Sequence, residues 1–447
     1  MKNHFFYFKK HIRLSSPIIL GQITTVLIAL SDTIMVGNYD TVALASAAFA
    51  NSAIFTFATF GIGLSYGLKP PVANAYAAKN YPLCAKYLQN GMVLYTLVSI
   101  LMWLGFEMTI PFLDYLDQPP SVVVLAIPYY RLVAFSIIPW FLFLALQQFS
   151  EALIKTKVPM SVNILACAVN IILNYLLIFG KFGFPELGLV GAGIATLVSR
   201  VLMLVVMLII FFALPFFRQF IDFTFSISVF SKDIFKKLLN IGVPIGMQMV
   251  FESGAFGVAA IMAGWISKEA LAAHQIALNI AFTTFMVAVG LSQGTTVAVA
   301  NLVGKNNLSE IKRTGRSAVY LIVIFMAVMA GLIFLFNGQI PLWYVNQSEA
   351  NAIEVIEITM QLLIIVAVFQ MTDGIQVVSA GNLRGLEDIK VPTAISLFSY
   401  WIIGIGGGYV LAFPVGMVVT GIWWGLCLGL ITSSILLTWR FERKKFD

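Results

Sequence analysis

Three carboxylates stand inside long apolar stretches of this sequence: Asp32, Glu252 and Asp373. Glu252 is the clearest, because "GMQMVFESGAFGVAAIMAG" (residues 246–264) carries no other charge. A charge in an apolar environment is costly and needs a partner, water or a bound ion. A cation or a proton that neutralises such a carboxylate removes that cost, so these residues are typical of coupling to an ion gradient. This chemistry needs no covalent step.

The alternative for these acids is structural. A buried ion pair with Arg131 or Arg200 would join two helices without any transport role. The sequence offers only these two bases within the spans, against three deep acids, so we favour the ion-coupling interpretation.

Other side chains near the acids have two explanations each. Amides can supply the oxygen ligands that a hard monovalent cation prefers, or they can make interhelical hydrogen bonds. Aromatic and methionine side chains can line a cavity for a cationic ligand, or pack against lipid and core. A lone histidine within a span, His274, is more often packing than a ligand. The candidate amides are Asn170, Asn174, Gln275 and Asn279, and the candidate cavity residues are Phe251, Phe256, Phe285, Phe369 and Met371.

The composition is that of an integral membrane protein. Of 447 residues, 60% are hydrophobic and 11% are charged, against about a quarter charged in soluble proteins. The mean hydropathy is +0.93. Each membrane span needs about 20 apolar residues. Twelve segments qualify: 13–38, 43–69, 88–112, 122–148, 158–180, 187–214, 238–264, 270–299, 316–338, 357–381, 392–413 and 416–439.

The basic residues predict the orientation of these spans. With the N-terminus inside, 23 of the 27 Lys and Arg residues fall on the cytoplasmic side, as the positive-inside rule requires. Both termini are then cytoplasmic, in a multi-pass protein of the cytoplasmic membrane. This asymmetry explains the net charge of +7 better than a nucleic-acid site does. The basic start predicts a cytoplasmic tail rather than a cleaved signal. The three cysteines form no spaced cluster, so we expect neither disulfides nor zinc.

The two halves of the chain repeat one another. A shift of 227 residues aligns 17–80 with 244–307 and gives 19 identities in 64 positions without a gap. Six spans in each half give both halves the same topology, with an axis along the membrane normal and a central cavity between two lobes. We expect an N-terminal lobe over 1–225 and a C-terminal lobe over 226–447, with an amphipathic inner connector at 215–237.

Aligning the two halves also relates the positions of the acids. The shift pairs Glu252 with Thr25 and Asp32 with Ala259. Thr25 and Asp32 are seven residues apart and share nearly the same helix face. Each lobe therefore keeps an acid on that face at a different depth, which predicts two lobes with different ion chemistry.

The chain resembles the multidrug and toxic compound extrusion (MATE) transporters, in particular the NorM-like branch, over essentially its whole length. The resemblance is carried by "PIILGQ" and "SDTIMVG" in the first span, "NIILNYLLIFGKFGFPELGLVGAGIAT", "FESGAFGVAAIMAG" with "AAHQIALNIAF", and "DGIQVVSAGNLRGLEDIKVP". It implies a V-shaped, two-lobed antiporter of twelve helices. Such a protein expels cationic, lipophilic compounds in exchange for Na⁺ or H⁺ by alternating access, without a cofactor and as a monomer.

The resemblance also assigns roles to residues. Glu252 and Asp373 match the carboxylates of a monovalent-cation site in the C-terminal lobe, with Gln275 and Asn279 near them. Asp32 matches the coupling acid of the N-terminal lobe, with Asn170 and Asn174 as its polar neighbours. Some NorM proteins carry a tyrosine four residues before the acid that Asp373 matches. This chain has Phe369 there, so that hydroxyl is lost.

Three other classes compete with an antiporter. A flippase for lipid-linked precursors shares the two-lobed architecture, but anionic pyrophosphate lipids call for several basic residues in the cavity, where acids dominate here. A channel needs rings of selective groups. An enzyme needs a catalytic constellation, and neither H-E-x-x-H, Gly-x-Ser-x-Gly nor a Cys/His set occurs. We therefore expect a transporter and keep the flippase as the alternative.

Overall fold

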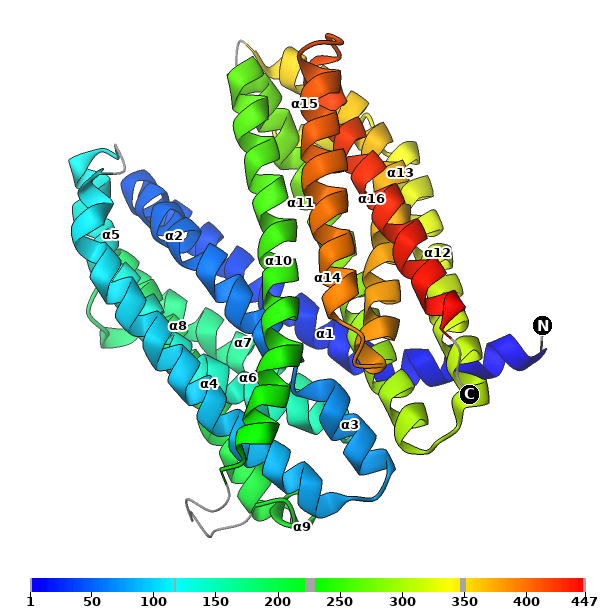
Figure 1. Ribbon diagram of the computed structural model, residues 1–447. Helices are drawn as coiled ribbons and strands as arrows, with labels where there is room; N and C mark the ends of the chain where they lie inside the picture. Colours follow the sequence, from blue (N-terminus) through cyan, green and yellow to red (C-terminus); the bar gives the residue numbers. More distant parts are fainter. Residues whose placement is uncertain (1, 116–117, 222–229, 346–350, 445–447) are drawn as a thin grey trace. The chain divides into compact units, whose positions relative to one another are not determined.

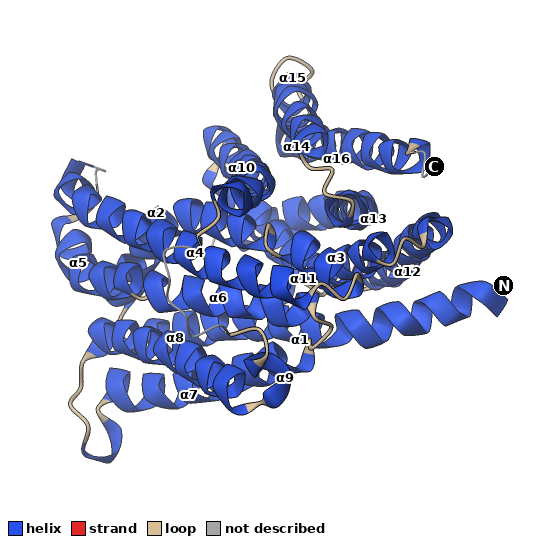
Figure 2. Ribbon diagram, turned by 60° about the horizontal axis from the view of Figure 1, so that its bottom comes forward, coloured by secondary structure: helices blue, strands red, loops and turns tan. Residues whose placement is uncertain are grey.

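The computed structural model describes residues 2–115, 118–221, 230–345 and 351–444, and every regular element in these ranges is a helix (Figure 2). Eleven helices are long and apolar enough to cross a membrane. A further pair, Thr41–Phe55 with Phe57–Ala77, is bent by 46° and counts as a twelfth span. All twelve expected segments fall on these spans, which confirms the all-α, twelve-span fold class. The amphipathic connector falls largely on 222–229, outside the described residues.

The chain divides into two compact units. The N-unit is Leu20–Gly246, and the C-unit combines Met1–Ile19 with Met247–Asp447. Two helices, α1 (Lys2–Tyr39) and α10 (Lys232–Ile266), belong to both. The N-unit also holds α2 (Thr41–Tyr66), α3 (Lys69–Ala77), α4 (Tyr81–Thr109), η1 (Ile110–Tyr115), α5 (Pro120–Phe135), α6 (Ile137–Ala152), α7 (Lys157–Phe179), η2 (Lys181–Gly183), α8 (Gly188–Ala213) and α9 (Pro215–Arg218).

The C-unit carries the remaining elements of the described chain. Its fourth long span is interrupted: between α14 and α15 the helix widens into the π-helix η6. The elements are α11 (Lys268–Gly304), η4 (Leu308–Glu310), α12 (Ile311–Leu335), η5 (Pro341–Trp343), α13 (Ala352–Gly385), α14 (Lys390–Leu397), η6 (Phe398–Gly406), α15 (Gly407–Ala412) and α16 (Val418–Arg443).

The observed units differ from the expected lobes, 1–225 and 226–447. The first turns of α1 pack in the C-unit, and the first half of α10 packs in the N-unit. Glycines allow this packing, since they let the backbones meet closely. A Cβ on Gly63 would lie 2.6 Å from Gly246 Cα, and one on Gly290 would lie 2.5 Å from Ile19 Cγ1. The 227-residue shift pairs these two contacts with each other, so both halves of the chain pack in the same way.

The repeat extends to the ends of the helices. Asp40 precedes α2 and accepts a hydrogen bond from the backbone N–H three residues on, at 2.8 Å. Ser267 precedes α11 and does the same at 2.9 Å. Both residues are extended N-caps, which satisfy donors that the first helical turn leaves open. Lys79 and Asn306 have φ of 59° and 54°, an uncommon conformation outside glycine. Each pair is related by the shift of 227 residues, so the internal repeat is confirmed in the backbone.

A buried ion pair joins α3 to α6 in the N-unit. Lys69 Nζ lies 2.5 Å from Glu151 Oε2, and both side chains are almost fully buried. Gln147 Nε2 donates to the other carboxylate oxygen, Glu151 Oε1, at 2.8 Å. Lys69 therefore belongs to the interior, whereas its charge alone suggested an exposed cytoplasmic residue.

The η6–α15 segment packs tightly against α16 in the C-unit. In Figure 1 these elements (orange to red) lie side by side. A Cβ on Gly425 would lie 2.2 Å from Gly408 Cα, and one on Gly429 would lie 2.6 Å from the carbonyl oxygen of Ser399. Only glycine fits at these two positions.

We expect Gly425→Ala to lower the free energy of unfolding by about 1–3 kcal/mol, because a methyl group forces the two backbones apart. Equilibrium unfolding in mixed micelles measures the change. Gly407→Ala is the matched control, since nothing lies within 4 Å of its added Cβ. Equal stability of the two variants would contradict the close packing.

An ion cluster ties the C-terminal end of α16 to the loop after α13. Asp388 accepts hydrogen bonds from Arg440 Nε at 2.9 Å and from Arg440 Nη2 at 3.0 Å, and Lys444 Nζ lies 2.8 Å from its Oδ2. Burial alone would raise the pKa of Asp388, but these hydrogen bonds and the charges of both bases hold it below its ordinary value of 3.8.

This cluster predicts a pH-dependent contribution to stability. Since the folded-state pKa of Asp388 is depressed, its stabilisation is present above about pH 4 and is lost as the pH falls through the folded-state pKa. We expect Asp388→Asn to be less stable than the wild type at pH 7, and the difference to close at low pH. Thermal unfolding at several pH values measures this. A difference that does not change with pH would contradict it.

Candidate functional site

Glu252 lies in the C-unit part of α10 and is held by two amides. The Nε2 atoms of Gln248 and Gln376 each lie 3.0 Å from Glu252 Oε1 and donate to it. Gln248 Nε2 also donates to Ser396 Oγ at 3.0 Å, and Gln248 Oε1 accepts from Arg384 Nη2 at 3.1 Å. The charge of the buried Arg384 interacts with that of Glu252. The Glu252 carboxylate is thus held by a polar network of side chains from α10, α13 and α14.

Asp373 on α13 is the second carboxylate of this site. It is 5% exposed, and its charge interacts with that of Glu252. No hydrogen bond or ion pair of Asp373 occurs among the described residues. Two acids of like charge in a region of low dielectric repel one another, and a shared cation or proton relieves that repulsion. The pair can therefore take up one positive charge.

The donor set favours a hard ion. Carboxylate and amide oxygens are ligands for hard cations, whereas soft metals select thiolates. Within the described ranges, no three His, Cys, Asp or Glu side chains converge as they would around a transition metal.

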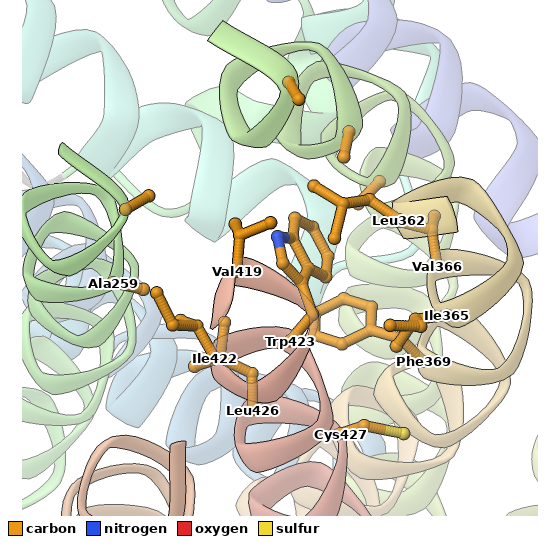
Figure 3. Packing of buried hydrophobic residues seen from close by; sticks show 14 of the residues in the cluster. Ala259, Leu362, Ile365, Val366, Phe369, Val419, Ile422, Trp423, Leu426 and Cys427 are labelled. Atoms are coloured by element: carbon orange, nitrogen blue, oxygen red, sulfur yellow. The ribbon is translucent and has the colours of Figure 1, made fainter. Parts of the chain in front are cut away.

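An aromatic side chain lies one helical turn from each acid, Phe256 after Glu252 and Phe369 before Asp373. Phe256 and Phe369 meet edge to face with ring centroids 6.1 Å apart, and Phe369 meets Trp423 at 5.5 Å. Figure 3 shows Phe369 and Trp423 packed together with aliphatic residues of α13 and α16. The backbone carbonyl of Phe251 accepts from Trp401 Nε1 at 3.1 Å. Phe369 therefore lies within a hydrophobic cluster, and Phe256 packs against that cluster.

The other predicted residues of this half lie elsewhere. Phe285 and Met371 pack against a separate cluster that includes Ala288, Ile322 and Met326. Gln275 and Asn279 are exposed on α11, and no hydrogen bond to either acid occurs in the described structure.

His274 is fully buried against Trp423, with ring centroids 5.5 Å apart. Neither of its ring nitrogens has a hydrogen-bond partner in the described structure. Its position fits packing rather than ligation of an ion at Glu252.

Asp32 forms a second polar group in the N-unit. Asn174 Nδ2 donates to Asp32 Oδ1 at 2.5 Å and to Asn170 Oδ1 at 3.1 Å. Both asparagines are fully buried, whereas Asp32 is half-buried. The three residues expected together from the sequence are thus in contact, from α1 and α7.

The two arginines that could have paired with the acids have other partners. Arg131 Nε lies 3.6 Å from Glu107 Oε2, and both side chains are partly exposed. Arg200 Nη1 donates to Ser136 Oγ at 2.7 Å, and its guanidinium lies 4.4 Å from the Trp140 ring. The charge of Arg200 interacts with Asp32, but the described residues include no ion pair within 4.0 Å between them. The acids are therefore not locked in ion pairs with these bases.

Sequence reasoning missed three residues of the C-unit site. Gln248 precedes Glu252 by four residues, and Gln376 follows Asp373 by three, so helical spacing alone puts each on the same face as its acid. Arg384 was assigned to the inner surface, but α13 continues to Gly385.

The fold and the site define a multi-pass helical membrane protein with an internal repeat and an acid within the spans of each half. The model of the MatE family matches this chain twice, at residues 17–176 and 244–410. The two matches begin at positions 17 and 244, which the internal repeat pairs. The chain belongs to this family, that of the multidrug and toxic compound extrusion transporters.

Relatives of similar length agree with this. The chain is 32% identical to the probable multidrug resistance protein NorM of Rhizobium meliloti over 98% of its own length and 93% of that protein. It is 34% identical to the protein of the same name from Rhodopseudomonas palustris, over 97% and 91%. The crystal structure of the eukaryotic MATE transporter AtDTX14 shares the fold, with a TM-score of 0.88 at 20% identity over 99% of this chain and 97% of that one.

Proposed function

We propose that this protein is a secondary active antiporter that exports cationic, lipophilic compounds in exchange for Na⁺ or H⁺. The observation that carries the proposal is a pair of carboxylates: Glu252, which is partly buried and held by two amides, and Asp373, which is buried and has no partner among the described residues. Names of relatives that refer to multidrug resistance support the substrate class.

The mechanism we propose is alternating access. An ion that enters from outside neutralises the Glu252–Asp373 pair, changes the relative free energy of the outward and inward states, and displaces the cationic substrate. A substrate cation from the cytoplasm then restores the charge balance. Asp32 is the corresponding acid of the other half. The amides of Gln248 and Gln376 hold Glu252 in place and keep its second oxygen available.

Aromatic walls fit this substrate class. A partly exposed ring such as that of Phe256 offers a face that attracts organic cations and apolar area that binds lipophilic groups, whereas Phe369 packs behind it in the core. A site with few acids and many aromatic rings places few directional constraints on the shape of its substrate, so we expect broad substrate selectivity.

We place the protein in the cytoplasmic membrane with both termini inside, acting as a monomer without a cofactor and with no enzymatic activity. The basic residues on the predicted inner side support this orientation.

Ethidium transport in everted membrane vesicles tests the proposal. We expect efflux activity to depend on an imposed sodium or proton gradient, and the gradient that drives it identifies the coupling ion. Vesicles without the protein are the control. Ethidium transport at the same rate with and without either gradient would contradict antiport. No ethidium transport at all is the result expected of a flippase for lipid-linked precursors.

A further inference from the structure

Two consecutive hydrogen bonds join Arg384 to Glu252. Arg384 Nη2 donates to Gln248 Oε1 at 3.1 Å, and Gln248 Nε2 donates to Glu252 Oε1 at 3.0 Å. Both Arg384 and Gln248 are buried. Arg384 lies in the last turn of α13, roughly 16 Å along the helix axis from Asp373. Gln248 therefore connects this arginine to the carboxylate site.

The chemistry of arginine fixes the orientation of the Gln248 amide. A guanidinium has N–H donors and no acceptor, so the amide must turn its carbonyl oxygen toward Arg384. The amide nitrogen then faces Glu252, and it also donates to Ser396 Oγ at 3.0 Å. A reversed amide would place N–H groups against the guanidinium and an oxygen against the carboxylate, and both hydrogen bonds would be lost. Arg384 thus holds Gln248 as a donor to Glu252.

The second amide beside Glu252 is not held in this way. Gln376 Nε2 donates to Glu252 Oε1 at 3.0 Å, but the buried Gln376 Oε1 has no hydrogen-bond partner in the described structure. This amide can donate to a carboxylate or, when turned over, accept from a carboxylic acid. The two amides therefore differ in how strictly they require Glu252 to be charged.

We propose that Arg384 is a positioning residue of the coupling site, which orients Gln248 and thereby favours the carboxylate form of Glu252 over the carboxylic acid. Because both amides donate to Oε1, the coupling ion is directed to the other carboxylate oxygen. The inference rests on the proposed function. The charged or titratable side chains that interact with Glu252 are Arg384 and Asp373 of α13 and Tyr400 of η6, and the variants that test Gln248 leave all three in place.

Binding of the lipophilic cation tetraphenylphosphonium to the purified full-length protein, measured over a range of pH, tests this. A proton on Glu252 competes with the cation, so binding should fall as the pH is lowered. We expect the midpoint of this fall to lie about one pH unit higher in Arg384→Met, the effect of one hydrogen bond to a charged group. Arg384→Lys, which also carries only donors, should restore the wild-type midpoint. Arg316→Met is the matched control, since Arg316 pairs with Glu442 at a partly exposed position.

Gln248→Met separates the hydrogen-bonded link from the charge of Arg384. This variant keeps the guanidinium and removes the amide, so we expect the same shift of the midpoint as in Arg384→Met. The double variant should show no further shift, because both substitutions interrupt the same link.

The outcomes are distinct. A wild-type midpoint in Arg384→Met or in Gln248→Met would overturn the assignment. Additive shifts in the double variant would also overturn it, because the charge of Arg384 would then act without Gln248. Lower thermal stability with an unchanged midpoint would show that Arg384 only supports the fold. Wild-type pH dependence of binding in Glu252→Gln would instead contradict the carboxylate site on which the proposed function depends.

Discussion

Glu252→Gln should abolish gradient-driven efflux. Glutamine keeps the size and the hydrogen-bonding capacity of the side chain but cannot carry the charge that a cation or a proton neutralises. We expect ethidium efflux to fall on the order of 100-fold, since an ionic interaction worth roughly 3 kcal/mol disappears. The vesicle assay described above measures it, under whichever gradient drives the wild type.

Asp373→Asn should have an effect of similar size, because the two acids share one site. Asp32→Asn tests the acid of the N-unit in the same assay. Glu107→Gln is the control, since this acid pairs with Arg131 near the surface. Gradient-dependent efflux at the wild-type rate in both Glu252→Gln and Asp373→Asn would remove the proposed coupling site.

Lys69→Met should be the most destabilising single substitution at the ion pairs described here. It leaves Glu151 charged in the interior with only the amide of Gln147 beside it. Removing one partner of a buried ion pair costs about 3–5 kcal/mol in the free energy of unfolding, because the remaining charge is uncompensated. Thermal and chemical unfolding in detergent measure this change.

Two variants separate charge from packing. Lys69→Met combined with Glu151→Gln removes both charges and should recover much of the lost stability. Arg316→Met breaks the ion pair with Glu442, whose Oε2 lies 2.6 Å from Arg316 Nη2, and both side chains are partly exposed. This substitution should lower the free energy of unfolding by less than about 1 kcal/mol. If Lys69→Met lowered the free energy of unfolding no more than Arg316→Met does, the buried ion pair would contribute no more to stability than the exposed one.

The helices of this protein are predictable from sequence because each span must be apolar along its whole length. Their approximate ends follow from Asp40 and Ser267, which are good N-caps, and from the basic residues between spans. The internal repeat can also be recognised from the sequence, since both halves keep glycines at positions where helices meet. The pairing of Asp32 with Asn174 was expected from the family resemblance, because the pattern of polar residues alone left open which acid the asparagines accompany.

Other parts of the site depend on information that a linear pattern does not contain. The π-helix at Phe398–Gly406 changes the helical period, so the burial of its residues, such as Ser399 and Tyr400, does not follow a period of 3.6 residues. Arg384 looked like a cytoplasmic base, because nothing in the sequence shows that α13 remains helical to Gly385. Gln275 and Asn279 are polar residues of α11, the helix after the one that carries Glu252, but both lie at exposed positions of that helix.

The way that α1 and α10 are shared between the two units has an evolutionary consequence. Each half of the chain contributes the start of its first helix to the unit formed mostly by the other half, at positions related by 227 residues. This is the connectivity of a domain-swapped dimer whose two subunits have been joined into one polypeptide. A six-helix protein with this sequence pattern would complete its fold only by exchanging helices with a second copy, and duplication and fusion of its gene would join the two copies in one chain.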